Sequence, residues 1–348
     1  MSYEVFISLT AFFYFYIAIK RPVKDSYSIK KDFFPKVLVM VPCKGLDIGL
    51  ERNLKSIKNQ KYGNFEILAI VDNEKDIALK VIKKAGLDYI TTSKKFCRGS
   101  GKVNALSTAI AANSDYDVYV IADSDINVER SWLSKLIAPL ADKRVGLSTS
   151  YPYFKATGGF WSRVKMVWGF VGNGMLESKL LRFGWGGSLA FRKEIIAGKV
   201  ARFSRYLSDD IAITDFVKEK GLELAYVPSA APIVETKDTR TTFWEWANRQ
   251  TAFSIRGNRK NFQFGVVFYL FDNVLLVSGV LLSIFVSYMF ILLLVPRSIG
   301  IMKLRRRLRQ SCRGFFIIAL AMPAIFLVNL LIANNMQSIE WRGRKYSV

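Results

Sequence analysis

A short apolar run at residues 118–122 ends abruptly at Asp123-Ser124-Asp125. A run this short and this rich in β-branched residues predicts a buried strand, so both aspartates should lie at its carboxyl end. Open α/β sheets place their ligand sites at that edge. The two carboxylates are suited to one hard cation, Mg²⁺ or Mn²⁺, because such ions prefer oxygen ligands. The alternative interpretation is a turn or a helix N-cap, which Asp-Ser-Asp also suits.

The chain around this run alternates strands with helices. Apolar runs predict strands at 36–41, 65–71, 89–92, 188–192 and 222–227, and helical periodicity appears at 47–60, 76–85, 103–112, 131–140 and 211–220. This alternation predicts an α/β fold with a doubly wound, mainly parallel sheet. Asp72 follows the strand at 65–71, so it should lie on the same sheet edge as Asp123. No G-x-G-x-x-G follows the first strand, which argues against a dinucleotide-binding dehydrogenase.

Both ends of the chain predict membrane segments. Residues 1–22 hold an apolar, aromatic run with a basic flank after it, which indicates a transmembrane anchor and not a cleaved signal peptide. A second membrane region is expected at 263–333, with two to three spans and a basic loop at 296–313, followed by a tail at 334–348. Its first part, 264–295, fits either one long tilted helix or a hairpin.

The basic loop should be cytoplasmic by the positive-inside rule. A single span at 264–295 would place this loop outside. A hairpin there would place the loop inside but the tail outside, so the sequence leaves the topology open.

Composition narrows the chemistry. The chain of 348 residues carries 51 Lys and Arg against 28 Asp and Glu, a net charge of +23, so an anionic partner is expected. The high apolar content favours a membrane over nucleic acid. The chain contains no histidine, which excludes His-ligated metals and Ser-His triads and leaves acid–base chemistry near neutral pH chiefly to carboxylates.

An aromatic, basic segment at 157–183 follows the first half of the chain. It predicts a helix that lies either at a membrane interface or in an ordinary core. Asp209-Asp210 precede the helical run at 211–220, where they fit a helix N-cap with an acidic first turn.

Taken in chain order, these motifs resemble the inverting glycosyltransferases of the glycosyltransferase-A fold, and within them the ceramide glucosyltransferase group. The matching residues are Lys44-Gly45, Asp72, 101–106, Asp123-Ser124-Asp125, Gly187-Ser188, 192–194, Asp209-Asp210, Arg249 and the tail at 339–346. The resemblance covers nearly the whole chain. It implies a cytoplasmic glycosyltransferase-A catalytic domain at 35–262 that moves a hexose from a nucleotide-diphospho-sugar like UDP-glucose to the hydroxyl of a lipid, either ceramide-like or another glycolipid precursor.

The resemblance also implies roles for individual residues. Asp72 would contact the base of the nucleotide, and Asp123 and Asp125 would hold a divalent cation, Mg²⁺ or Mn²⁺, on the donor diphosphate. Lys102 would add positive charge there, although a solvated helix residue is the alternative. Asp210 would be the general base, with Asp209 as a like charge beside it.

One motif departs from the family pattern. Where that pattern has Gln or Arg, two residues and then Arg-Trp, this chain has Trp246-Ala247-Asn248-Arg249-Gln250. Arg249 is kept and would clamp phosphate bidentately. The replaced tryptophan leaves the acceptor preference open.

Three other functions fit parts of the sequence. Transfer to a polyprenyl phosphate is compatible with the aromatic segment, and polysaccharide synthesis is less so because it generally needs a longer transmembrane channel. A non-catalytic cationic lipid-binding protein would account for the charge of +23 but not for acids at several strand and loop ends.

Overall fold

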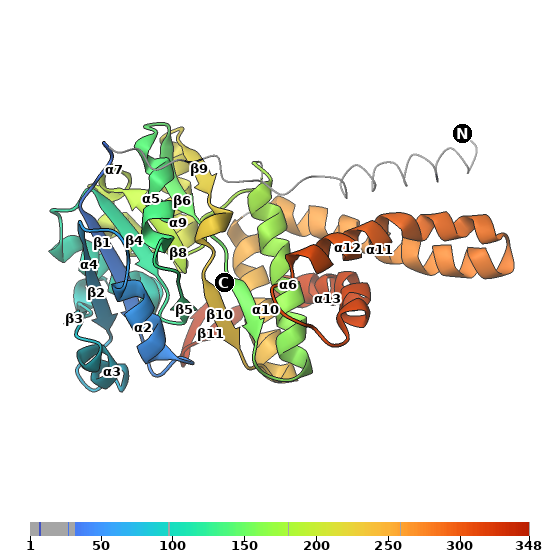
Figure 1. Cartoon of the computed structure of the whole chain (residues 1–348), viewed down its shortest axis with the longest axis horizontal. Helices are drawn as coiled ribbons and strands as arrows, with labels where there is room; N and C mark the ends of the chain where they lie inside the picture. Colours follow the sequence, from blue (N-terminus) through green and yellow to red (C-terminus); the bar gives the residue numbers. More distant parts are fainter. Residues whose placement is uncertain are drawn as a thin grey trace.

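The computed structural model describes residues 7, 27, 32–96, 98–179, 181–257 and 259–347. The N-terminal anchor predicted at 1–22 therefore lies outside the described residues, apart from position 7. The chain forms an α/β body, and a long helical arm extends from one end of it (Figure 1).

The central sheet has the strand order β3-β2-β1-β4-β8-β6-β9. Its members are β1 (Val37–Cys43), β2 (Phe65–Val71), β3 (Asp88–Thr91), β4 (Val118–Ala122), β6 (Val145–Thr149), β8 (Ser188–Arg192) and β9 (Glu223–Tyr226). All neighbouring strands are parallel except that β8 runs antiparallel to both β4 and β6. The expected α/β fold with a mainly parallel sheet is confirmed.

Helices cover both faces of this sheet. In β1, Val37, Val39 and Val41 face one core, whereas Leu38 and Met40 face the other, as expected for a strand buried on both sides. The first core contains α2 (Leu50–Lys58), α3 (Ala78–Lys84), α5 (Trp132–Ile137) and α6 (Phe160–Glu177). The second contains α4 (Gly101–Ala112), α7 (Lys193–Ile196), α8 (Val200–Phe203) and α9 (Asp209–Glu219).

A second, three-stranded sheet begins directly after the Asp-Ser-Asp motif. It consists of β5 (Ile126–Asn127), β10 (Ile233–Thr236) and β7 (Tyr153–Ala156). Because β5 follows Asp125, neither aspartate of the motif caps a helix, and the N-cap interpretation is wrong. The turn interpretation is correct, since Ser124 and Asp125 form a turn in which the Ile126 N–H donates to the Asp123 carbonyl at 3.4 Å.

The aromatic helix α6 belongs to the core. Val164, Met166 and Val167 are buried, and Trp168 packs against Trp246 with ring centroids 4.8 Å apart. Trp246 lies in α10 (Arg240–Gly257), so α6 and α10 form one packed layer beside the sheet. Of the two interpretations of this segment, the structure agrees with the core helix.

The arm is a helical hairpin. Helix α11 (Arg259–Phe285) is followed by a 3₁₀ segment, η4 (Tyr288–Leu294), and by α12 (Val295–Arg307), which return along α11 (Figure 1). A Cβ at Gly279 would lie 2.8 Å from a methyl carbon of Leu294, which shows how closely the two limbs pack. Residues 264–295 therefore do not form one long helix, and the hairpin alternative is the one observed.

Helix α13 (Phe315–Asn335) lies along the α/β body at both of its ends. Near its start, Phe315 and Ile318 join the main core. Near its end, Ala333 packs with Ile255 of α10 and with Ile339. By length and composition, α11 and α13 are the helices among the described residues that could cross a membrane.

Candidate active site

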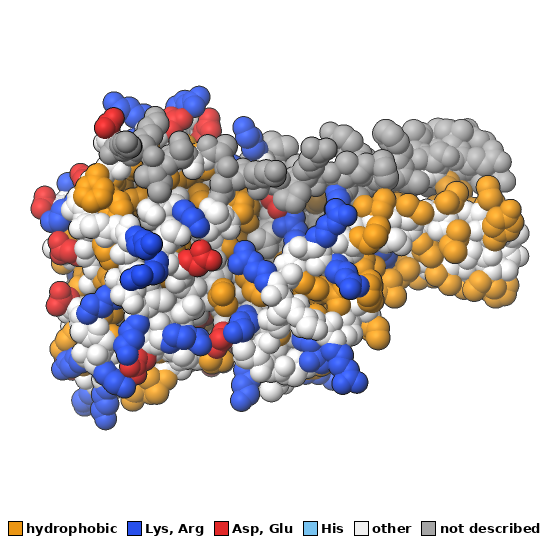
Figure 2. All heavy atoms as spheres, in the orientation of Figure 1, with side chains coloured by type: hydrophobic (Ala, Val, Ile, Leu, Met, Phe, Trp, Pro, Cys, Tyr) orange, Lys and Arg blue, Asp and Glu red, His pale blue; other side chains and the backbone are white. Residues whose placement is uncertain are grey.

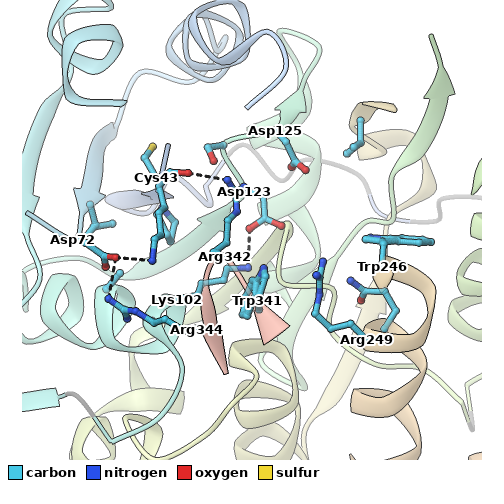
Figure 3. Close-up of a pocket in the computed structure, with 18 of the residues that line it drawn as sticks. Cys43, Asp72, Lys102, Asp123, Asp125, Trp246, Arg249, Trp341, Arg342 and Arg344 are labelled. Carbon is cyan, nitrogen blue, oxygen red and sulfur yellow. Dashed lines mark hydrogen bonds and ion pairs between the residues drawn. The ribbon is translucent and has the colours of Figure 1, made fainter. Parts of the chain in front are cut away.

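A cavity of about 330 Å³ opens at the carboxyl ends of β1, β2 and β4. The predicted residues Asp72, Lys102, Asp123, Asp125 and Arg249 all line it (Figure 3). We call it the charged cavity. Strands β2 and β4 flank β1 in parallel, so the residues that follow them, Asp72 and Asp123, share one sheet edge as predicted.

Lys102 lies at the start of α4, and its ammonium joins two acidic groups. Its Nζ is 2.7 Å from Asp123 Oδ1 and 3.3 Å from Asp209 Oδ2. The side chain is only 12% exposed, so the interpretation of Lys102 as a solvated helix residue is wrong. Burial alone would lower the pKa of this ammonium, but the Asp123 and Asp209 carboxylates outweigh it and raise the pKa.

The backbone of Gly186 connects this lysine to the second acid. The Gly186 carbonyl accepts from Lys102 Nζ at 3.1 Å, and its N–H donates to Asp210 Oδ2 at 3.2 Å. A Cβ at position 186 would lie 2.3 Å from Asp209 Oδ2, so only glycine fits here. Gly186 lies in the loop just before β8. Because β8 runs antiparallel to β4, the first residue of β8, Ser188, pairs with Ala122 at the end of β4, and the loop is brought to the site.

Asp209 and Asp210 point in different directions from the first turn of α9. Asp209 is buried and faces Lys102, whereas Asp210 lines a second cavity. Asp210 Oδ1 accepts from the Ile211 N–H at 2.8 Å and from the Ser208 hydroxyl. The two neighbours therefore have separate surroundings and separate possible roles.

Two acids of the site have strongly raised pKa values. Burial raises the pKa of Asp209 to about 7, against the opposing charge of Lys102. Burial, with the charge of Asp123 added, raises the pKa of Asp125 to about 7. Asp125 Oδ1 is buried and lacks a hydrogen-bond partner within the part of the chain that the structure describes.

This unpartnered oxygen fits a cation ligand. Among the described residues no group of three or more His, Cys, Asp or Glu side chains surrounds one metal position. Two aspartates are nevertheless enough for an ion such as Mg²⁺, which usually takes its remaining ligands from water and from substrate phosphates.

The second cavity has a volume of about 440 Å³ and is mostly apolar. It runs from Asp210 to the helices of the C-terminal region, and its apolar lining includes Trp168, Met175, Phe183, Phe253, Phe264, Phe268, Phe326 and Leu330. We call it the apolar groove. Trp185 and Gln250 line both this groove and the charged cavity, so the two meet at these side chains.

Arg249 enters the charged cavity from α10. Its guanidinium carbon lies 5.7 Å from the ring centre of Trp341, and no carboxylate among the described residues forms an ion pair with it. Burial, followed by the nearby charge of Arg342, lowers the pKa of Arg249 to about 10. Trp246 and Gln250, the two departures from the family pattern, line the same cavity one helical turn apart.

The sequence did not single out several residues of this site. Asp47 accepts from Arg342 Nη2 at 2.6 Å and from the Ser124 hydroxyl at 2.5 Å. Arg344 donates to Asp72 Oδ2 at 3.0 Å. The two arginines belong to the C-terminal tail, whose resemblance to a family ending gave no indication that it folds back onto the sheet edge.

Comparison with known proteins agrees with this fold and site. The chain matches the family model described as glycosyl transferase family 21 over residues 3–348, and it belongs to that family. It is 24% identical over 288 residues to a protein named "Probable glycosyltransferase YdaM" from Bacillus subtilis (strain 168), a match that covers 74% of this chain and 67% of that protein.

A solved structure with a similar fold is mannosyltransferase PcManGT from Pyrobaculum calidifontis, in complex with GDP-Man and Mn²⁺. The TM-score is 0.56 at 15% identity, and the match covers 95% of this chain and 96% of that chain. The predicted family and the predicted glycosyltransferase-A fold are thus confirmed.

Proposed function

We propose that this glycosyltransferase is a membrane-bound, inverting enzyme that moves a hexose from a nucleotide-diphospho-sugar to the hydroxyl of a lipid, ceramide-like or another glycolipid precursor. One observation carries the proposal: a charged cavity and an apolar groove meet at Trp185 and Gln250, and Asp210 lies on the apolar side of that junction. A donor with a charged leaving group and an acceptor with an apolar body would fit these two spaces.

The charged cavity suits a nucleoside diphosphate. Asp123 and Asp125 would hold a divalent cation, which when bound would neutralise negative charge on the leaving diphosphate. Lys102 and Arg249, which forms no ion pair with the described residues, add positive charge at the same place. Asp72, at the end of β2, would contact the base of the nucleotide. The GDP-Man and Mn²⁺ bound to PcManGT support this assignment.

Asp210 would act as the general base. Its carboxylate is fixed by hydrogen bonds from the Gly186 and Ile211 amides, so it is oriented before the acceptor arrives. It would take the proton of the acceptor hydroxyl while that oxygen bonds to the anomeric carbon. The bond from this carbon to the diphosphate oxygen breaks, and its electron pair leaves with the nucleoside diphosphate. One such displacement inverts the configuration.

The position of Asp210 favours a hydroxyl acceptor over a polyprenyl phosphate. A phosphate oxygen is already ionised, so it needs no base, and a carboxylate beside it would repel it. Arg182 also lines the groove, but its guanidinium donates to the backbone carbonyls of Leu176 and Leu224 and is therefore already engaged, so it is not held ready for an acceptor phosphate.

The C-terminal helices would place the groove at a membrane. Phe285 and Tyr288 at the tip of the arm are 79% and 78% exposed, and Figure 2 shows hydrophobic side chains spread over the arm. Contiguous apolar surface of this kind indicates contact with lipid. We propose that the arm enters the bilayer from the cytoplasmic side and returns.

Helix α13 would then lie along the membrane surface. The segment before it and the tail after it both contact the α/β body: Arg307 pairs with Glu177 at 2.7 Å, and Arg342 pairs with Asp47 at 2.6 Å. A helix with both ends at the same body does not need to cross the bilayer. This arrangement puts the basic loop and the tail on one side, as the positive-inside rule requires of the loop.

The test is lipid labelling. Membranes that contain the native protein, incubated with labelled nucleotide sugars and Mn²⁺ and then extracted, should yield labelled glycolipid, and those with Asp210→Asn should not. Glu219→Gln is the matched control, because Glu219 is an acid on the same helix that lines neither the groove nor the charged cavity, and it should leave labelling intact. Equal labelling by the native protein and Asp210→Asn would remove Asp210 as the base.

A further inference from the structure

The last residues of the chain form a β-hairpin that reaches into the charged cavity. Its strands are β11 (Ser338–Trp341) and β12 (Arg344–Ser347), which pair antiparallel with Trp341 opposite Arg344. Trp341, Arg342, Arg344 and Tyr346 all line the cavity, and Figure 3 shows the two arginines among the acids of the site. The hairpin therefore forms one wall of the cavity.

The turn of this hairpin has a costly backbone. Arg342 has φ 51° and Gly343 has φ 72°, so both central residues of the two-residue turn adopt left-handed conformations. Such turns usually take Asn-Gly, since few other side chains tolerate this geometry. Among the described residues, Arg342 is the only one other than glycine that has a positive φ. Residues held in such strained conformations cluster at functional sites, so the guanidinium of Arg342 is a candidate for a functional contact.

The partners of the two guanidiniums are the acids of the donor site. Arg342 donates to Asp47 and to the carbonyl of Lys44 at 2.7 Å. Burial alone would lower the pKa of Arg342, but the charge and hydrogen bond of Asp47, followed by the charges of Asp125 and Asp123, raise it. Arg344 donates to Asp72, which also pairs with Lys44 at 3.2 Å. Each arginine thus lies beside a different part of the charged cavity.

The hairpin also contacts the amino-terminal end of α4. The Gly101 N–H, which has no partner within its own helix, donates to the Tyr346 hydroxyl at 3.1 Å. A Cβ at Gly101 would lie 2.6 Å from Arg344 Nη1, so the helix end and the hairpin approach each other closely. Arg344 is consequently held beside the amino-terminal end of α4 and Lys102, both of which favour an anion.

We propose that Arg342 and Arg344 bind the phosphates of the nucleotide donor, so that the C-terminal hairpin completes the donor site. In the absence of donor they neutralise the acids of the cavity. With donor present, their guanidiniums turn to the diphosphate, for which two-pronged hydrogen bonding is well suited. The inference rests on the proposed function, because it assumes that the charged cavity takes a nucleoside diphosphate.

The two arginines should serve different phosphates. Arg342 lies beside the Asp123–Asp125 loop, where the cation and the phosphate next to the sugar would be. Arg344 lies beside Asp72, at the nucleoside end. Loss of Arg342 should therefore weaken binding of a diphosphate more than of a monophosphate, and loss of Arg344 should weaken both.

Titration calorimetry on the purified full-length protein tests this, with UDP, GDP and the matching monophosphates in the presence of Mn²⁺. Arg342→Gln should lower diphosphate affinity about tenfold and monophosphate affinity about twofold or less, whereas Arg344→Gln should lower both about tenfold, as expected for the loss of one charge-assisted contact. Lys345→Gln is the control: it removes the same charge from the same strand at a residue outside the cavity lining, and affinity should stay within about twofold.

Lysine variants separate binding from folding. Arg342→Lys and Arg344→Lys keep the charge and the contacts to the acids but lose the two-pronged geometry, so they should fold as the native protein does and still bind diphosphate more weakly. Native affinity in the glutamine and lysine variants alike would overturn the inference. If the native protein bound none of these nucleoside diphosphates, the proposed function itself would fall.

Discussion

Asp209 Oδ2 lies 3.3 Å from Lys102 Nζ, and the same ammonium lies 2.7 Å from Asp123 Oδ1. The buried ammonium of Lys102 thus pairs both with Asp123, which would face the metal, and with Asp209, which neighbours the proposed base Asp210. Lys102→Met should lower the free energy of unfolding by about 3 kcal/mol, because it leaves Asp209 buried without its counter-ion. The double variant Lys102→Met, Asp209→Asn should recover part of this loss. Denaturant unfolding of the four proteins measures the coupling, and strictly additive effects would contradict it.

Asp209 should also make stability depend on pH. Its folded pKa of about 7 lies above the value of about 4 for a free aspartate, so its contribution is fully present below pH ~4 and is lost as the pH rises through 7. Asp209→Asn removes this loss. The melting temperature of the variant relative to the native protein should therefore rise between pH 5 and pH 8. Asp125 titrates in both proteins, so its contribution cancels when their melting temperatures are compared. A difference in melting temperature that does not change with pH would refute the raised pKa of Asp209.

Gly174 offers a test of the apolar groove that separates function from stability. It lies within α6, lines the groove, and has no heavy atom within 4 Å of where a Cβ would be. Gly174→Leu should stabilise the helix by up to about 1 kcal/mol and yet obstruct the acceptor, raising the acceptor KM. Gly300→Leu is the control, because Gly300 also faces open space in a helix, α12, but does not line the groove. Unchanged acceptor kinetics in Gly174→Leu would argue against the groove as the lipid site.

Local patterns predicted the parts of the site that depend on neighbouring residues. The acids at 72 and 123 follow apolar runs that had to be strands, and parallel pairing then fixes them to one edge. The direction of β8 was not predicted, because the apolar pattern of a strand is the same whether it runs parallel or antiparallel to its neighbours. That direction is what brings Gly186 to Lys102 and Asp210.

Contacts between distant segments were not predictable in the same way. Arg342 and Asp47 are 295 positions apart, and nothing in the composition of the tail indicates that it returns to the sheet edge. The arm shows a similar limit. Hydropathy identified the apolar stretch at 264–295, but a hydropathy pattern does not show that α11 ends at Phe285 or that Gly279 packs closely against Leu294.

Gln250 should control the passage between the two cavities. It occupies the position where the family pattern has tryptophan, and it lines both the charged cavity and the apolar groove. Gln250→Trp adds volume at this junction, so it should lower the rate of transfer to lipid by about tenfold or more, with affinity for a nucleoside diphosphate within about twofold.

Gln250→Leu keeps roughly the same volume but removes the amide, which separates the two properties of this side chain. If bulk is the cause, the leucine variant should transfer at close to the native rate. If the amide positions the acceptor hydroxyl or the sugar, leucine should be as slow as tryptophan. Radiolabelled transfer and calorimetry on the same preparations measure both quantities. A fall in donor affinity equal to the fall in transfer would show that Gln250 belongs to the donor site alone.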